Sequence, residues 1–143
     1  IEFARHKLGF KHANSSEFDK DTEYPVIDLM PDQQGNIPLG GTMRLGAYPC
    51  KVHPNSIMER AYGKPEVAER HRHRYEFNNK YRENGMVFTG TSPNGLLVEA
   101  VEIPENKFYI GVQYHPEFKS RPNKAHPIFR EFIKASLENR EAK

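Results

Sequence analysis

A histidine and a glutamate separated by one proline form the clearest chemical pattern in the sequence. They lie in Tyr114-His115-Pro116-Glu117-Phe118, directly after an apolar run. Pro116 favours an extended backbone at His115, and side chains two residues apart in an extended segment point the same way. His115 and Glu117 are therefore predicted to face one cavity, where the carboxylate orients the imidazole as in a nucleophile–base–orienter triad. A turn in which both side chains are merely solvated remains the alternative.

A second segment, which reads ERHRHRYEFN, alternates arginine with histidine. In a strand, Arg70, Arg72 and Arg74 would share one face. His71 and His73 would then share the other face. Guanidinium groups on one face repel one another unless they meet carboxylates or phosphates. Three interpretations remain open: a site for a substrate carboxylate or phosphate, a His-x-His metal site, and a solvated row of ion pairs. The metal site is disfavoured because no Cys or carboxylate is spaced to complete a tetrahedron.

A glycine-rich segment and the one cysteine could also carry chemistry. Residues 40–46 (GGTMRLG) resemble a phosphate-binding loop but lack its Gly-Lys-Ser/Thr ending. The better prediction is a strand entrance with tight backbone packing. Cys50 stands in a strand-like context before Lys51, and not at the helix N-terminus where a reactive thiol is often found. We therefore predict that Cys50 is a structural residue.

The elements that must position these residues follow a mixed pattern. Periodicity predicts strands within 40–52, 69–77, 86–90, 96–103 and 108–114, and a strand or a helical turn at 25–30. Short helices are predicted at 1–6, 55–62 and 78–85. Turn signals predict loops at 11–24 and 32–38. The run 108–114 is typical of a strand buried on both faces. A final helix begins at Pro127 and carries an apolar stripe: Ile128, Phe129, Phe132, Ile133 and Leu137. This mixture predicts an α/β fold.

The composition limits the classes of partner. The 143 residues are expected to form one compact domain, and 21 Lys and Arg against 19 Asp and Glu give a net charge of +2. A charge so close to zero creates no global field that attracts nucleic acid or acidic lipid. The single cysteine excludes an internal disulfide and fits a reducing compartment. We therefore expect a cytoplasmic protein with no nucleic-acid and no membrane partner.

Together these motifs resemble the class I (triad) glutamine amidotransferases. The His-Pro-Glu element is shared by many members of that family. Residues 40–46 and 70–78, with 13–18 and 118–122, more narrowly resemble the branch whose members supply ammonia for the amination of UTP to CTP. The likeness covers nearly the whole chain, and the motifs occur in the matching order. The arginine–histidine run is much more specific to this branch than the His-Pro-Glu element.

The resemblance implies a flavodoxin-like, mostly parallel sheet flanked by helices, of which residues 1–143 form the C-terminal part. In the family, a cysteine attacks the side-chain amide of glutamine, forms a glutamyl thioester and releases ammonia. His115 matches the general base and acid, and Glu117 matches the residue that orients it. Arg74 matches the residue that pairs with the α-carboxylate of glutamine, and Glu17 matches the one that holds the α-amino group.

The resemblance also implies cofactors and partners. The ammonia passes to a synthetase domain of the same protein, where ATP and magnesium activate the 4-position of UTP. No cofactor or metal is implied within residues 1–143 themselves. GTP is implied as an allosteric activator of glutamine hydrolysis, and Arg44 is a candidate for communicating with it. The complete ligase is expected to be a homo-tetramer.

The matching nucleophile is expected outside this sequence. By the resemblance, the nucleophilic cysteine, its oxyanion loop and the synthetase domain precede Ile1. We therefore expect the isolated chain not to hydrolyse glutamine, since loss of the nucleophile alone costs about 10⁶-fold in a comparable triad enzyme. Two alternatives remain open: an amidotransferase that serves a purine or chorismate pathway, and a non-catalytic binding or assembly module.

Overall fold

The computed structural model describes residues 1–30, 43–81 and 85–142. They form two compact units: the first unit is Ile1–Arg44 with His73–Asn84, and the second unit is Leu45–Arg72 with Gly85–Lys143. Strands and helices both occur, and this confirms the predicted α/β class. The predicted loop 32–38 and the start of the glycine-rich segment, residues 40–42, lie outside the described residues. No helix in the described part of the chain is long and apolar enough to cross a membrane.

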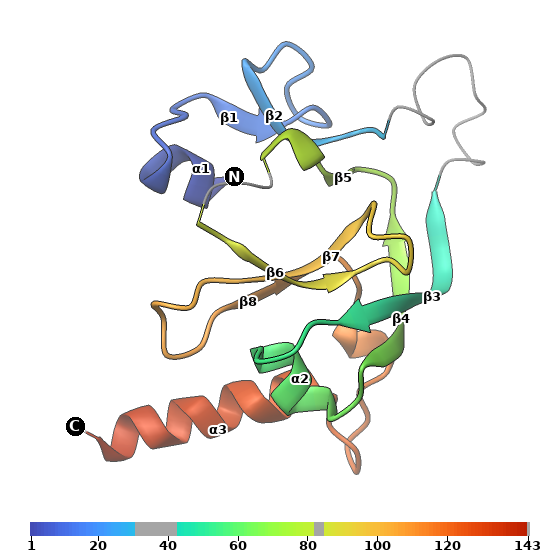
Figure 1. Cartoon of the computed structure of the whole chain (residues 1–143), viewed down its shortest axis with the longest axis vertical. Coiled ribbons are helices and arrows are strands. Elements are labelled where there is room, and N and C mark those ends of the chain that lie inside the picture. The colour runs from blue at the N-terminus through green and yellow to red at the C-terminus, as the bar shows by residue number, and fades with distance from the viewer. Residues whose placement is uncertain (31–42, 82–84, 143) are drawn as a thin grey trace. The chain divides into compact units, whose positions relative to one another are not determined.

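The first unit contains a three-stranded sheet in the order β1-β2-β5 (Figure 1). Its elements are α1 (Glu2–Lys7), β1 (Ala13–Ser15), β2 (Tyr24–Asp28), β5 (Glu76–Phe77) and the 3₁₀ turn η3 (Asn79–Tyr81). β1 and β2 pair in parallel, and β2 and β5 pair antiparallel. Ala4, Ala13 and Val26 form the buried core, beside which the ring of Phe10 stacks on Tyr24 with centroids 4.5 Å apart.

The second unit contains a five-stranded sheet in the order β4-β3-β6-β7-β8 (Figure 1). Its elements are β3 (Arg44–Val52), α2 (Ile57–Tyr62), β4 (Glu66–His73), β6 (Val87–Thr91), β7 (Val98–Glu102), β8 (Ile110–Val112), the 3₁₀ turn η4 (Pro116–Phe118) and α3 (Pro127–Glu141). The parallel pairing that the resemblance implies is present between β1 and β2, whereas β6 pairs antiparallel with both β3 and β7. Helix α2 packs against α3 and β6.

The core of the second unit includes the one cysteine of the chain. Cys50 is fully buried and clusters with Val52, Met58, Ala100 and Tyr114. Gly90 of β6 lies so close to this cluster that an added Cβ would come within 2.9 Å of the Met58 sulfur. The prediction that Cys50 is a structural residue is confirmed by this packing.

Local sequence signals set the ends of several elements. Ser56 caps α2, because its side chain accepts a hydrogen bond from the backbone N–H of Glu59 at 2.9 Å. Gly63 ends the same helix with a φ of 62°, a left-handed conformation that glycine adopts without strain. Gly95, with a φ of +73°, closes the predicted turn between β6 and β7. The end of α2 at Gly63 and the turn at Gly95 confirm the sequence-based predictions, whereas the cap at Ser56 was not predicted and α2 begins at Ile57, two residues after the predicted start.

Other predictions were wrong in their extent. The predicted loop 11–24 includes β1, and the predicted strand 69–77 breaks into β4 and β5. The strand predicted over 108–114 shortens to β8, which is half-buried and stands at the end of the sheet order within the described residues. The helix predicted at 78–85 is the single turn η3 where it is described. In the apolar stripe of α3, Ile128 is buried and the other members are exposed: Phe129, Phe132, Ile133 and Leu137.

Candidate active site

The structure brings His115 and Glu117 into direct contact in the second unit. The Nδ1 atom of His115 lies 2.7 Å from the Oε1 atom of Glu117. His115 has an extended backbone, with φ −107° and ψ 91°, and Pro116 follows it at the start of η4. The prediction of an extended backbone is confirmed for His115, but Glu117 lies in the 3₁₀ turn η4, so the turn and not a two-residue strand period brings the two side chains together. The contact shows that the two side chains are paired and are not separately solvated, as the alternative interpretation had them.

The contact also determines which nitrogen of His115 carries the proton. The hydrogen bond from His115 lowers the pKa of the Glu117 carboxyl below its usual value, so this carboxyl is ionised near neutral pH. An ionised carboxylate can only accept hydrogen bonds, and Nδ1 must therefore be the N–H donor. The neutral ring then keeps a lone pair on Nε2. This arrangement makes Nε2 the position at which His115 can take a proton from a nucleophile.

Two further contacts hold the backbone and ring of His115. Its backbone N–H donates to the carbonyl oxygen of Arg70 on β4 at 2.8 Å. Its imidazole stacks on the ring of Phe118, with centroids 4.6 Å apart and an interplanar angle of 12°. The side chain is 36% exposed, so another group can approach the ring. The loop after β8 is thus tied to β4 at His115.

The predicted substrate-binding residues, Glu17 and Arg74, lie in the first unit. Glu17 follows β1 by two residues, and β1 ends at Ser15. Asp28, at the end of the parallel strand β2, pairs with Glu76, and Arg74 precedes Glu76 by two residues. Glu17 and Arg74 therefore lie at the same end of the three-stranded sheet. One strand separates β1 from β5, which corresponds to about 10 Å. A carboxylate and a guanidinium at one sheet edge offer both charges that a zwitterionic amino acid requires.

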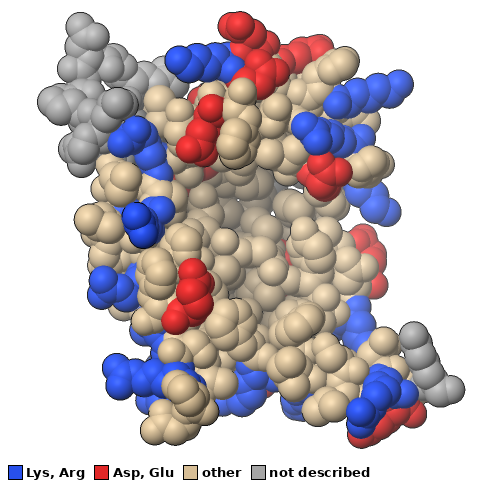
Figure 2. All heavy atoms as spheres, turned by 180° about the vertical axis from the view of Figure 1, so that it is seen from behind, with Lys and Arg blue, Asp and Glu red and all other residues tan. Residues whose placement is uncertain are grey.

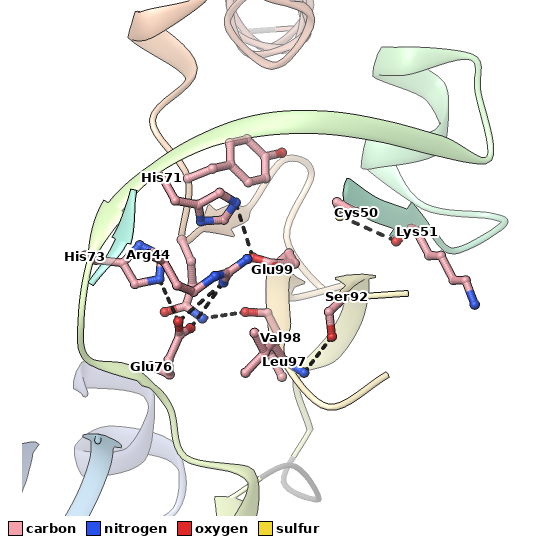
Figure 3. A network of polar contacts seen from close by, with 12 residues as sticks. Arg44, Cys50, Lys51, His71, His73, Glu76, Ser92, Leu97, Val98 and Glu99 are labelled. Atoms are coloured by element: carbon pink, nitrogen blue, oxygen red, sulfur yellow. Dashed lines mark hydrogen bonds and ion pairs between the residues drawn. The ribbon is translucent and has the colours of Figure 1, made fainter. Parts of the chain in front are cut away.

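The histidines of the arginine–histidine segment each face a different carboxylate (Figure 3). In the second unit, His71 Nε2 lies 3.6 Å from Glu99 Oε2, and both side chains are fully buried. In the first unit, His73 Nε2 lies 3.0 Å from Glu76 Oε1, which is also 3.3 Å from Arg44 Nη1. The His-x-His metal site is therefore not formed by this pair. The described part of the chain contains no group of three or more His, Cys, Asp or Glu side chains that could hold a metal ion.

The arginines follow the predicted alternation only within β4. Arg70 and Arg72 are exposed, whereas Glu69 and His71 are buried. Arg74 lies beyond the end of β4 and is half-buried, so the prediction that the three arginines share one face was wrong for this residue. On the face that Figure 2 shows, Lys and Arg are interspersed with Asp and Glu, in agreement with the near-neutral net charge.

Sequence reasoning missed a buried polar cluster beside the His115 loop. Glu69 accepts hydrogen bonds from the Tyr62 hydroxyl and from His126, and Lys119 lies close to the same oxygen. The one signal in the sequence is the position of Glu69 two residues before His71, which puts both on the inward face of β4. Local patterns could not reveal the partners, because they lie up to 57 residues away along the chain.

The sequence of the chain is similar to those of known proteins. Residues 9–135 match the family "Glutamine amidotransferase class-I". The chain is 56% identical over 141 residues to CTP synthase of Staphylococcus epidermidis, which covers 96% of this chain and 26% of that protein. CTP synthase of Staphylococcus aureus (strain JH9) is 56% identical over 147 aligned positions, covering 100% of this chain and 27% of that protein. The chain thus spans about a quarter of the length of the CTP synthases it matches.

Two solved structures have folds similar to that of this chain. The glutaminase domain of Trypanosoma brucei CTPS with bound acivicin matches with a TM-score of 0.89 and 35% identity, over 96% of this chain and 55% of that chain. A putative GMP synthase component from Thermoplasma acidophilum matches with a TM-score of 0.52 and 20% identity, over 70% of this chain and 47% of that chain. The second match concerns the fold alone.

Proposed function

Since this chain belongs to the class I glutamine amidotransferase family, we propose that it supplies the proton-transferring pair and the substrate-binding groups of a CTP synthase glutaminase. This activity hydrolyses glutamine and delivers ammonia for the ATP-dependent amination of UTP to CTP. The observation that carries the proposal is the 2.7 Å contact between His115 Nδ1 and Glu117 Oε1, in a chain 56% identical to CTP synthases.

The proposed proton transfers use His115 twice. Its Nε2 takes the proton from a cysteine thiol, and the thiolate attacks the amide carbon of the glutamine side chain. Glu117 stabilises the imidazolium that forms, because its carboxylate accepts the Nδ1–H. His115 then gives the proton to the amide nitrogen, the carbon–nitrogen bond breaks, ammonia leaves, and a glutamyl thioester remains. Water, deprotonated by the same imidazole, hydrolyses the thioester to glutamate and restores the thiol.

The thiol in this scheme is not Cys50. Its sulfur belongs to the buried core cluster of the second unit, and the side chain has no exposed surface. We therefore propose that the nucleophile comes from another part of the same polypeptide. The matched CTP synthases are about four times as long as this chain, so a polypeptide of their length has further segments that could carry the nucleophile.

Recognition of glutamine is proposed to use Glu17 and Arg74. Arg74 pairs with the α-carboxylate, since a guanidinium matches the two oxygens of a carboxylate with two donors. Glu17 accepts hydrogen bonds from the α-ammonium group. The position of both residues at one end of the three-stranded sheet supports this assignment.

The remaining partners are proposed from the same family relationship. A synthetase domain of the same polypeptide receives the ammonia and uses ATP and magnesium to activate UTP. GTP is proposed as an allosteric activator of glutamine hydrolysis, and its communication through Arg44 stays a prediction. We also propose a homo-tetramer in the cytoplasm, and the single cysteine of the chain fits a reducing compartment.

The test is the activity of the full-length polypeptide that carries this chain. CTP formation from UTP and ATP is measured with glutamine and, in parallel, with ammonium as the nitrogen source. The proposal predicts CTP formation with both, and one glutamate released for each CTP when glutamine is supplied. Glutamine hydrolysis without UTP amination would support another amidotransferase of the same class. CTP formation with ammonium alone would leave the chain as a non-catalytic module.

A further inference from the structure

A polar cluster in the second unit joins four segments around the buried carboxylate of Glu69. Glu69 lies on β4 and is 1% exposed. Its Oε1 accepts hydrogen bonds from the Tyr62 hydroxyl of α2 at 2.9 Å and from His126 Nε2 at 3.2 Å. The Nζ of Lys119 lies 3.4 Å from the same oxygen, and the Tyr114 hydroxyl lies 3.2 Å from that of Tyr62. These five residues are called the Glu69 cluster below.

The contacts of His126 determine its tautomer. His126 is the N-cap of α3, and its Nδ1 accepts the backbone N–H of Ile128 at 3.3 Å. An accepting Nδ1 carries no proton, so Nε2 is the N–H that donates to Glu69. A single neutral imidazole therefore connects the first turn of α3 to the carboxylate on β4.

The charges of the cluster favour an ionised Glu69. Burial by itself raises the pKa of this carboxyl, but the hydrogen bonds from His126 and Tyr62 and the positive charge of Lys119 lower it below its usual value. Burial also raises the pKa of the Tyr62 hydroxyl, which therefore remains a donor. Glu69 thus acts as an anionic acceptor that three donors share.

The cluster brackets the loop that carries the proposed base. Tyr114 is the residue immediately before His115, and Lys119 is the second residue after Glu117. His126 ends the same loop at the start of α3. All three bracketing residues belong to the Glu69 cluster, and no residue of the cluster is a member of the His115–Glu117 pair itself.

Backbone contacts show that β4 is the support for this loop. The N–H of His115 donates to the carbonyl of Arg70 at 2.8 Å, and Lys119 Nζ donates to the carbonyl of Ala68 at 2.5 Å. Ala68 and Arg70 are the two neighbours of Glu69 along the strand. The side chain of Glu69 and the backbone on either side of it therefore hold one and the same loop.

We propose that Glu69 is a positioning residue for proton transfer, which fixes the 114–126 loop through Lys119 and His126 so that His115 presents Nε2 in the reactive orientation. The proposal rests on the function proposed above for His115 and Glu117. Without the carboxylate, Tyr62, His126 and Lys119 lose their shared acceptor, and the loop gains freedom at the place where the base must be held. A misplacement of about 1 Å in a reacting group is enough to cost about 100-fold in rate.

The experiment compares three variants of the full-length polypeptide. Glu69→Gln keeps the size of the side chain but removes the anion. His126→Asn retains a residue that caps helices well and removes the Nε2–H that reaches Glu69. Glu66→Gln is the matched control, since Glu66 is an exposed glutamate at the start of the same strand. The readouts are kcat and KM with glutamine, the rate with ammonium, and deuterium exchange of peptides that cover residues 114–120.

For Glu69→Gln we expect kcat with glutamine to fall about 10- to 100-fold, while KM and the rate with ammonium change little. The amides of 115–120 should exchange faster. His126→Asn should shift the same quantities in the same direction, and Glu66→Gln should shift none. A normal kcat in both cluster variants, or an equal loss with glutamine and ammonium, would overturn the proposal. If Glu69→Gln does not fold, His126→Asn decides.

The outcome separates this inference from the proposed function. If the unmodified polypeptide fails to use glutamine, the proposed function fails, whereas deuterium exchange still reports whether Glu69 holds the loop. Normal use of glutamine together with unchanged kcat in both cluster variants defeats the positioning role alone.

Discussion

Substitution of Cys50 tests whether the one thiol of the chain is a core residue or a nucleophile. Cys50 is fully buried on β3, and its Sγ lies 3.5 Å from the carbonyl oxygen of Lys51. It packs with Val52, Met58 and Ala100, so its removal leaves a small cavity. Two variants are informative: Cys50→Ala removes one heavy atom, and Cys50→Ser keeps the size but buries a hydroxyl group.

If Cys50 is a core residue, its substitution should lower the free energy of unfolding and leave kcat unchanged. Loss of one methylene-sized group from a packed core, with the cavity that it leaves, destabilises a protein by about 1–2 kcal/mol. A nucleophile behaves differently, because its removal lowers kcat by about 10⁶-fold in a comparable triad enzyme. The two interpretations thus differ by several orders of magnitude in rate.

The assay measures glutamate release by the full-length polypeptide, together with its unfolding in urea. We expect both variants to keep the kcat of the unmodified protein, and the midpoint of unfolding to fall for Cys50→Ala. Complete loss of glutamate release in a variant that remains folded would refute the assignment of Cys50 to the core. It would also remove the reason for placing the nucleophile elsewhere in the polypeptide.

Three further predictions concern charged groups. Arg74→Ala should raise the KM for glutamine about 10- to 100-fold, as expected for a lost charged hydrogen bond, and leave the rate with ammonium unchanged. Arg72→Ala, a change of an exposed arginine on β4, is the control. An equal loss of the rates with glutamine and with ammonium would indicate a structural role for Arg74. Glu117→Gln should lower kcat with glutamine about 10- to 1,000-fold, less than for a fully buried triad carboxylate, because the pair with His115 is partly exposed; an unchanged kcat would contradict the orienting role. The pKa of Glu69 is lowered in the folded state, so its ionisation stabilises the fold above the unfolded-state pKa near 4.5, and this stabilisation is lost as the pH falls through the folded-state pKa. The free energy of unfolding in urea, measured from about pH 6 to about pH 3, should therefore depend less on pH in Glu69→Gln than in the unmodified protein. The same pH dependence in both proteins would contradict this expectation.

Predictions from the sequence succeeded where the cause is local. The extended backbone of His115 follows from Pro116, although the chain then turns into η4 and does not continue as the predicted extended segment. The end of α2 follows from a left-handed glycine, Gly63, directly after the last helical residue. In each case the residues that determine the structure are within a few positions of the residue that adopts it.

Predictions failed where the structure depends on distant partners. β1 consists of three residues within a polar stretch and is a strand because it pairs with β2. The apolar period of α3 identifies the stripe, but it does not determine which members are buried. The Glu69 cluster joins Tyr62 to His126 across 64 positions, and no short motif contains both.

The central claim is that His115, oriented by Glu117, transfers protons for glutamine hydrolysis. The most direct measurement is the ratio of CTP formed with glutamine to CTP formed with ammonium by the His115→Asn variant of the full-length polypeptide. We predict that the rate with glutamine falls by about 10⁴-fold or more while the rate with ammonium is unchanged. An unchanged ratio, with both rates preserved or both lost together, would contradict the claim.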